Sequence, residues 1–349
     1  MAEQKALLLK EKCGPLVLGT RPIPKPGPGE LLVKVQAVGL NPVDWKIQTF
    51  GFVVEEYPTV LGSDIAGDVE ELGEGVDATK WPKGSRVFYQ GNYMTNNTTG
   101  FQQYSLIPAD LVAKTPPKLT YSEAASIPVA FLCAAYGLFA PKPYGGELNP
   151  GFDQAVKFGG ESSLVIAGNT SVGQYTTQLL RKVLGFSKVI VYASKTSEDY
   201  LKTLGATHII DRHAVSLQNL PTVIRDLTVD SPLKVVFDAF GTSEGQNGLV
   251  SVLEEGGLLC SVDPRTISDI TENGKRAFGV IGVVHFPTHR AYGVKLIKQM
   301  ERWVEEGVIV PNRVRDLPDG LAGIVEGLEA VKKNKTDGCK LIAHPQENL

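Results

Sequence analysis

A turn with two glycines joins an apolar segment to a segment of helical character. The apolar segment 163–167 (SLVIA) runs into the turn 168–173 (GNTSVG), and residues 174–184 have helical length. Such a turn aims backbone N–H groups and the positive end of a helix at a phosphate group. The dinucleotide pattern GxGxxG is only partly met, because Thr170 stands at its middle glycine, and an ordinary strand-to-helix turn stays an alternative. The cofactor contacts expected here are Gly168, Thr170, Ser171, Val172 and Gly173.

The end of the next apolar segment, 188–193, indicates which dinucleotide is bound. A carboxylate about 20 residues past the glycines would bind the ribose hydroxyls of NAD. This chain has Ser194 and Lys195 there, with no acid before Glu198. A hydroxyl and an ammonium can bind a 2′-phosphate, which favours NADPH. A solvated surface role for Lys195 is the alternative, and Arg212, after the following strand, is a second candidate phosphate contact.

From about residue 128 the chain alternates between apolar segments and segments of helical length. The apolar segments are 163–167, 188–193, 208–210, 234–240, 256–262 and 278–284. Strands this apolar are expected in a parallel sheet that is covered on both faces. With helices such as 172–184 and 196–205 between them, they predict a doubly wound domain. An amphipathic helix is expected at about 288–306, before a tail that ends KLIAH.

The first part of the chain, from Lys5 to about Leu119, has short apolar segments interrupted by Pro and Gly. The stretch 21–30 (RPIPKPGPGE) cannot be helical. Apolar and polar residues alternate over 33–37, which indicates a half-buried strand, so this part is expected to be mostly β. Asn41-Pro42-Val43-Asp44 combines a capping residue, a proline and an acid, and predicts a short helix with Lys46 just inside it.

Composition limits the class of protein. A chain of 349 residues exceeds the usual single core, so two domains are expected. The 35 Lys+Arg and 38 Asp+Glu residues nearly balance, and no basic run recommends nucleic acid as a partner. The four cysteines, Cys13, Cys133, Cys260 and Cys339, are far apart, and the N-terminus resembles neither a signal peptide nor a membrane span. We expect a cytoplasmic protein without a membrane partner.

Five segments together resemble the medium-chain dehydrogenase/reductase superfamily over nearly the whole chain. They are GELLVKVQAVGLNPVDWK, PTVLGSDIAGDVEELG, GSRV, EAASIPVAFLCAAYGL and AGNTSVGQ. NPVDWK and IPVA resemble its zinc-free branch of quinone oxidoreductases and, more closely, fungal trans-acting enoyl reductases and ene reductases. The resemblance implies an α/β protein with a GroES-like, β-rich substrate domain (1–127 and 285–349), a Rossmann cofactor domain (128–284) and a cleft where they meet.

The chain departs from the zinc alcohol dehydrogenases of that superfamily at the metal ligands. Those enzymes carry a Cys before the Asp of the first helix and a Gly-His-Glu further on, where this chain has Asn41 and Ser63-Asp64. The cysteines of a structural zinc lobe are missing, and the five histidines lack ligand spacing. We therefore expect no metal site. Without a Lewis acid, conjugate reduction is favoured over carbonyl reduction, because hydrogen-bond donors can stabilise an enolate.

The resemblance also implies roles for single residues. Lys46 would hydrogen-bond the nicotinamide ribose or the substrate carbonyl, unless it is an exposed helix lysine. Cys133 replaces the usual Thr and is either a weak donor or a core cysteine. The loop 141–160 is long, so its Tyr144 either borders the substrate or lies on a surface excursion. Substrate contacts are expected at Asn41, Cys133 and Tyr144. Further cofactor contacts are expected at Asp44, Lys46, Phe240, Gly241, Val262 and Lys340.

The function expected from these features is NADPH-dependent reduction of the activated C=C bond of an α,β-unsaturated carbonyl. The substrate is a free enal or enone, or an enoyl thioester held by a polyketide synthase carrier domain. A quinone reductase and a non-catalytic NADPH-binding protein are the alternatives. The proton donor stays open among Tyr57, Tyr89, Tyr93 and solvent, and the chain is expected to be a monomer or a homodimer.

Overall fold

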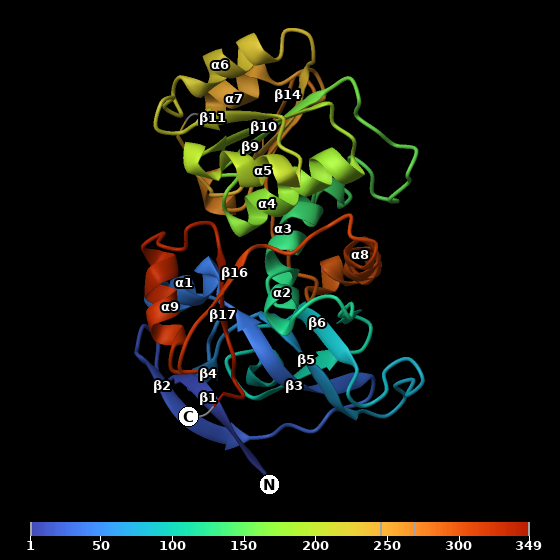
Figure 1. Cartoon of the computed structure of the whole chain (residues 1–349), viewed down its shortest axis with the longest axis vertical. Helices are drawn as coiled ribbons and strands as arrows, with labels where there is room; N and C mark the ends of the chain where they lie inside the picture. The colour runs from blue at the N-terminus through green and yellow to red at the C-terminus, as the bar shows by residue number, and fades with distance from the viewer. Residues whose placement is uncertain (1, 245, 268–269, 348–349) are drawn as a thin grey trace. The chain divides into compact units, whose positions relative to one another are not determined.

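The computed structural model describes residues 2–244, 246–267 and 270–347 (Figure 1). Its internal contacts divide the chain into two compact units. The first, here called the discontinuous unit, consists of Met1–Val129, Val284–Glu306 and Val310–Leu349. The second, the central unit, consists of Ala130–Val283 with Gly307–Ile309.

The central unit is built on a seven-stranded sheet with the order β11-β10-β9-β12-β13-β15-β14. Every neighbouring pair is parallel except β14 and β15, which pair antiparallel. The parallel, doubly wound sheet expected from the apolar segments is therefore confirmed. The strands are β9 (Ser162–Ile166), β10 (Lys188–Ala193), β11 (His208–Asp211), β12 (Leu233–Asp238), β13 (Leu258–Ser261), β14 (Ile270–Glu272) and β15 (Lys275–Gly279).

Helices cover both faces of this sheet (Figure 1). Helix α4 contacts α5, and α6 contacts α7. Buried Leu164, Val236 and Leu259 of the strands pack in one core cluster with Ile224 of α6 and Leu249 of α7. The helices are α3 (Pro128–Phe139), α4 (Ser171–Gln178), its π-helical continuation η2 (Leu179–Val183), η3 (Lys195–Ser197), α5 (Glu198–Leu204), α6 (Leu220–Leu227), α7 (Gln246–Val252) and η4 (Pro264–Thr266).

The strand expected at 278–284 is wrong beyond Gly279, where β15 ends. A Cβ on Gly279 would lie 2.5 Å from Pro264 Cα, and one on Gly282 would lie 2.6 Å from Cys133 Cα. The chain thus leaves the sheet and passes closely over helix α3, which only glycine permits. An apolar run that packs against a helix has the same composition as a buried strand, so the pattern could not separate the two.

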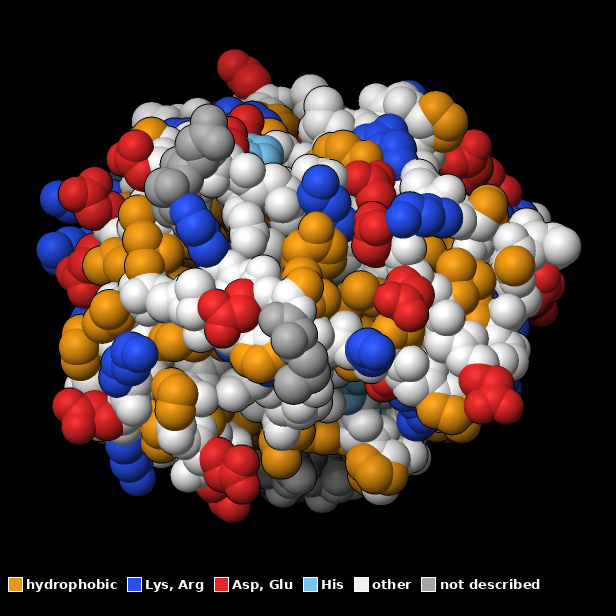
Figure 2. Space-filling model, turned by 90° about the horizontal axis from the view of Figure 1, so that it is seen from below, with side chains coloured by type: hydrophobic (Ala, Val, Ile, Leu, Met, Phe, Trp, Pro, Cys, Tyr) orange, Lys and Arg blue, Asp and Glu red, His pale blue; other side chains and the backbone are white. Residues whose placement is uncertain are grey.

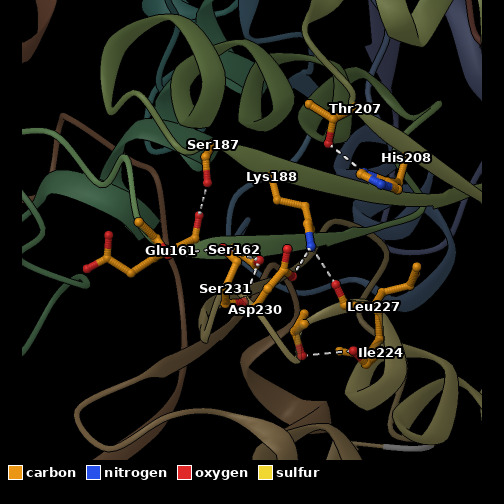
Figure 3. A network of polar contacts seen from close by, with 12 residues as sticks. Glu161, Ser162, Ser187, Lys188, Thr207, His208, Ile224, Leu227, Asp230 and Ser231 are labelled. Carbon is orange, nitrogen blue, oxygen red and sulfur yellow. Dashed lines mark hydrogen bonds and ion pairs between the residues drawn. The ribbon is translucent and has the colours of Figure 1, made fainter.

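Polar contacts close the sheet at the amino ends of its strands (Figure 3). Lys188, the first residue of β10, donates to Leu227 O at 2.6 Å and to the Asp230 carboxylate at 2.8 Å. At the first residue of β9, Ser162 Oγ donates to Ser231 O at 2.7 Å. This network joins the first residues of β9 and β10 to the end of α6 and the segment after it. The opposite, carboxyl edge of the parallel strands is outside this network and is the edge where a ligand is expected.

The discontinuous unit is β-rich, as expected. One sheet has the order β2-β1-β4, and the other has the order β16-β17-β3-β5-β6-β8, with β7 also paired to β3. The strands are β1 (Glu3–Leu9), β2 (Leu16–Pro22), β3 (Glu30–Gly39), β4 (Thr59–Val60), β5 (Asp64–Leu72), β6 (Arg86–Gln90), β7 (Tyr104–Pro108), β8 (Ala113–Lys114), β16 (Val314–Asp316) and β17 (Lys340–Ala343).

The helices of this unit are α1 (Pro42–Phe50), η1 (Asn96–Thr98), α2 (Tyr121–Ala124), α8 (Pro287–Glu305) and α9 (Ile324–Lys332). The short helix predicted after Asn41 and the amphipathic helix predicted near 288–306 are confirmed as α1 and α8. Strand β17, almost at the chain end, pairs antiparallel with β3 through Ile342 and Ala343. The tail is therefore an integral part of the unit.

The distribution of surface charge and the burial of the longest apolar helical stretch both bear on possible partners. Cationic, anionic and apolar side chains are interspersed on the face drawn in Figure 2. Within the described residues, one stretch, Tyr121–Phe139, is long and apolar enough to cross a membrane, but 83% of it is buried inside the structure. Such burial is typical of a core helix. The cytoplasmic location and the lack of nucleic-acid and membrane partners stay predictions.

Candidate functional site

The carboxyl edge of the parallel sheet collects five segments predicted to bind the cofactor. Neighbouring strands are parallel and in register, so the residues that follow them lie along one edge. Gly168 follows β9, Ser194 follows β10, Arg212 follows β11, Phe240 follows β12 and Val262 follows β13. The structure therefore brings together residues that are nearly one hundred positions apart.

In the glycine turn after β9, the backbone packs closely against neighbouring residues. A Cβ on Gly168 would lie 2.0 Å from Val191 Cγ1 of β10, and one on Gly173 would lie 2.6 Å from Ala167 O. Thr170 takes the place of the missing middle glycine by capping α4, because its Oγ1 accepts from Gly173 N at 3.1 Å. Ser171 and Val172 form the first turn of α4. The turn thus presents a helix N-terminus at the sheet edge, where a pyrophosphate would fit.

The sequence pattern missed Ala167, which has the left-handed φ of 56°. A residue with a Cβ is disfavoured in this region, and such strained residues are common at ligand sites. The only sequence signal is its place directly before the glycine turn.

Asp238 shapes the loop after β12. Its carboxylate accepts from the backbone N–H groups of Phe240 (3.0 Å), Gly241 (3.0 Å) and Thr242 (2.8 Å). Burial raises the pKa of Asp238, and these donors oppose the rise. The carboxylate ends the strand at 238, two residues before the expected end, and turns Phe240 outward to 57% exposure. No site prediction from the sequence covers Asp238, although an acid inside an apolar run is a visible signal.

At the end of β10, two hydroxyl groups contact each other and two ammonium groups contact one carboxylate. Ser194 Oγ lies 3.0 Å from Thr196 Oγ1. Lys195 forms an ion pair with Glu198, whose carboxylate also lies 2.7 Å from Lys202 Nζ. Arg212 is exposed next to them, and its backbone N donates to Ala193 O at 3.0 Å. The cations of this part of the edge are Lys195, Lys202 and Arg212, and its acids besides Glu198 include Asp199 on α5 and Asp211 at the end of β11.

In the discontinuous unit, Asn41 and Lys340 lie in a buried polar cluster. Lys340 Nζ lies 2.6 Å from both Asn41 Oδ1 and Asp64 Oδ2. Asn41 Nδ2 donates to the same Asp64 oxygen at 2.8 Å, and Val129 N donates to the other at 2.6 Å. The side chains of Lys340 and Asp64 are 3% and 0% exposed. Each member of the cluster has its charge or hydrogen-bonding groups matched, as burial requires.

Asp44 extends this cluster along helix α1. Its carboxylate accepts from Asn41 N at 2.8 Å, from Gly62 N at 3.1 Å and from Tyr93 Oη at 2.6 Å. Burial raises the pKa of Asp44 to about 6, against the lowering effect of these donors and of Lys340. Tyr93 Oη also lies 2.8 Å from Ser63 Oγ. Because the single tyrosine proton points to Asp44, the serine is the donor in that contact.

The remaining predicted residues lie on α1, on α3 and in the loop between α3 and β9. Lys46 is half-buried, with its ammonium 5.9 Å from the centre of the Trp45 ring. Cys133 is half-buried on α3 beside Gly282, and Tyr144 is 39% exposed in the loop between α3 and β9. Two of the three tyrosines left open as proton donors lie elsewhere: Tyr89 is fully buried, and Tyr57 Oη donates to Val54 O at 3.4 Å. The roles of all these residues stay predictions.

A zinc ion does not fit the side chains at the positions where the sequence resemblance would place its ligands. Asn41 and Asp64 are engaged by the Lys340 ammonium, which puts a cation between them, and Ser63 is engaged by Tyr93. Among the described residues, no group of three His, Cys, Asp or Glu side chains could hold a metal ion.

Known proteins match both units. Residues 27–117 match the family model of the alcohol dehydrogenase GroES-like domain, and residues 171–284 match that of the zinc-binding dehydrogenases. A zinc-type alcohol dehydrogenase-like protein of Schizosaccharomyces pombe is 31% identical, over 97% of this chain and 99% of its own length. The trans-enoyl reductase tndF of Aspergillus flavipes is 37% identical over 70% of this chain and 72% of its own.

A solved structure of a putative zinc-dependent alcohol dehydrogenase protein from Rhizobium etli has a TM-score of 0.83, with 22% identity over 99% of this chain and 98% of its own. At this identity the likeness concerns the fold alone. The chain belongs to the medium-chain dehydrogenase/reductase superfamily, in its enoyl reductase branch. It is therefore an oxidoreductase of a family that uses a nicotinamide cofactor.

Proposed function

We propose that the protein uses NADPH to reduce the activated C=C bond of an α,β-unsaturated carbonyl, with hydride transfer to the β-carbon. In this proposal, residues 128–284 form the cofactor domain, and residues 1–127 with 285–349 form the substrate domain. The substrate is a free enal or enone, or an enoyl thioester on a carrier domain. The protein is soluble and cytoplasmic and acts without zinc.

One observation carries the choice of an activated double bond. The side chains that stand where zinc enzymes carry their ligands are joined to the ammonium of Lys340 in a buried cluster. They are therefore unsuited to supply a Lewis acid for alcohol or ketone chemistry. Reduction of a conjugated double bond needs only positioning and hydrogen-bond donors, because the negative charge spreads into an enolate. The similarity to a trans-enoyl reductase supports the same reaction.

The sheet edge supports the cofactor. The close packing of Gly168 against Val191 and of Gly173 against Ala167 forms the turn that brings the N-terminus of α4 to the sheet edge, and Thr170 caps that helix. We propose that the pyrophosphate binds at this helix N-terminus. Ser194 and Lys195 offer a hydroxyl and an ammonium where NAD enzymes carry an acid. These groups favour a 2′-phosphate, so NADPH is the proposed cofactor.

Bound NADPH would supply the hydride. The residues of the chain bind and orient: Lys46 would donate to the nicotinamide ribose or to the substrate carbonyl. Asn41 is proposed as a substrate contact whose amide orientation is fixed by Lys340 and Asp64. Solvent or a positioned donor completes the reaction with one proton.

A substrate panel tests this proposal. The purified chain is mixed with NADPH and an enal, an enone, an enoyl thioester or a quinone, and the loss of NADPH absorbance is followed with and without a zinc chelator. We expect turnover with at least one unsaturated carbonyl, none with the quinone, and no effect of the chelator.

Two contrary results would identify another function, and a third would contradict zinc independence. Turnover with the quinone alone would identify a quinone reductase. NADPH binding without turnover on any substrate would identify a non-catalytic binding protein. Loss of activity with the chelator, together with one zinc per chain in metal analysis, would contradict zinc independence.

A further inference from the structure

Glu198 lies among the cations at the end of β10. It is the first residue of α5, and its carboxylate contacts Lys195 on one side and Lys202, one turn later, on the other. Its side chain is 20% exposed, whereas those of Lys195 and Lys202 are 63% and 50% exposed. Hydrogen bonds from Lys195 and then Lys202 lower the pKa of Glu198, so it is ionised at neutral pH.

This arrangement gives Lys195 an anion within its own chain. A 2′-phosphate that approaches Lys195 meets an ammonium already paired with a carboxylate, and it also meets the negative charge of that carboxylate. Lys202 contacts the same carboxylate from the other side. It therefore weakens the ion pair between Glu198 and Lys195. The three groups together carry one net positive charge, and without Glu198 they would carry two.

We propose that Glu198 competes with the 2′-phosphate of the cofactor for Lys195, and that Lys202 sets the strength of this competition. The inference rests on the proposed NADPH specificity. Glu198 thereby determines how strongly the protein distinguishes NADPH from NADH, since only NADPH carries the phosphate.

Binding measurements with NADPH and NADH test this inference without turnover. Glu198→Gln keeps the size of the side chain and removes its charge. We expect the Kd for NADPH to fall about two- to fivefold, the scale of an exposed ion pair, with the Kd for NADH unchanged. Asp199→Asn is the matched control, because it removes the same charge from the same helical turn without an ion pair to Lys195. Its charge acts on Lys202, so it should change the Kd for NADPH clearly less than Glu198→Gln does and leave the Kd for NADH unchanged.

Lys202→Met tests the second half of the inference. In the wild-type background it should weaken NADPH binding, since the Glu198 carboxylate then forms its ion pair with Lys195 alone. In the Glu198→Gln background it should have a smaller effect, because Lys202 then has no carboxylate to draw away from Lys195 and retains only its own attraction for the phosphate across solvent. An equal effect in both backgrounds would show that Lys202 acts on the phosphate directly and would overturn this half.

Weaker or unchanged NADPH binding by Glu198→Gln, or an equal shift for NADPH and NADH, would overturn the competition. The proposed function fails by a different result, a wild-type protein that binds NADH as tightly as NADPH. The ratio of the Kd values for NADPH and NADH in the wild type thus tests the proposed preference for NADPH. The change of this ratio in Glu198→Gln tests the role of Glu198.

Discussion

The ammonium of Lys340 lies 2.6 Å from the carboxylate of Asp64, and the two side chains are 3% and 0% exposed. A buried pair of this kind stabilises a fold little in net terms, but the loss of one partner leaves the other charge buried and unpaired. The pair joins β17, near the chain end, to the start of β5.

Lys340→Met should therefore lower the free energy of unfolding by about 3–5 kcal/mol in urea denaturation. Lys333→Met is the control, because the ion pair of Lys333 with Glu329 is exposed on both sides (60% and 53%), and pairs of that kind contribute about 0–1 kcal/mol. Equal losses in the two variants would contradict a special role for the buried pair.

Asp44 should make stability depend on pH. Its pKa is raised from 3.8 to about 6 by burial, so between about pH 4 and pH 6 the folded state binds more protons than the unfolded state. Stability from this group is complete below pH 4 and is lost as the pH rises through about 6. Two pKa units correspond to about 3 kcal/mol.

The measurement is urea unfolding of the wild type and of Asp44→Asn from pH 4 to pH 7. The wild type should lose about 3 kcal/mol relative to the variant over this range. Glu326→Gln, an exposed acid on α9, should run parallel to the wild type. A constant difference between wild type and Asp44→Asn would exclude a titrating Asp44.

We expect that residue 168 must be glycine because it packs closely against Val191. Gly168→Ala places a Cβ 2.0 Å from Val191 Cγ1, and overpacking costs about 1–3 kcal/mol. In a Val191→Ala background the clash is removed, so the same change should cost at least about 1 kcal/mol less. Gly151→Ala, which has no atom within 4 Å of the new Cβ, is the neutral control. The prediction fails if the two changes are additive.

The fold was largely predictable from the sequence, because apolar strands, polar helices and a capping residue at 41 are local signals. The end of β15 at Gly279 was not, since a chain that leaves a sheet over a helix has the same apolar composition as a strand. The candidate site was half predictable. Residues after strands share an edge by topology alone, whereas the contact of Lys340 with Asn41 spans 299 positions and has no local signal.

Lys195→Ala should weaken NADPH binding about tenfold, since it removes the charge-assisted contact that we propose between Lys195 and the 2′-phosphate, and should leave NADH binding unchanged. Lys333→Ala, an exposed lysine of the discontinuous unit, serves as the control in a fluorescence titration with both cofactors. Equal weakening with NADPH and NADH would mean that Lys195 supports the fold of the loop and not the phosphate.

Lys46→Ala should reduce kcat/KM while activity survives, because one lost donor to developing charge costs about 2.7–4 kcal/mol at most. Lys332→Ala is a matched control, because its ammonium lies 5.6 Å from the same Trp45 ring. It should stay near wild type. A Lys46→Ala enzyme that binds NADPH normally but shows no turnover would identify Lys46 as the essential proton donor.

The pairing of β17 with β3 has a consequence for biosynthesis. A ribosome makes the chain from the N-terminus, so Asn41 and Asp64 leave it long before the lysine that neutralises their cluster. The central unit, whose sheet is continuous in sequence, can assemble while the discontinuous unit still lacks its last strand. During translation the central unit can therefore fold before the discontinuous unit that it interrupts is complete, and the nascent N-terminal segment must stay soluble until β17 has been made.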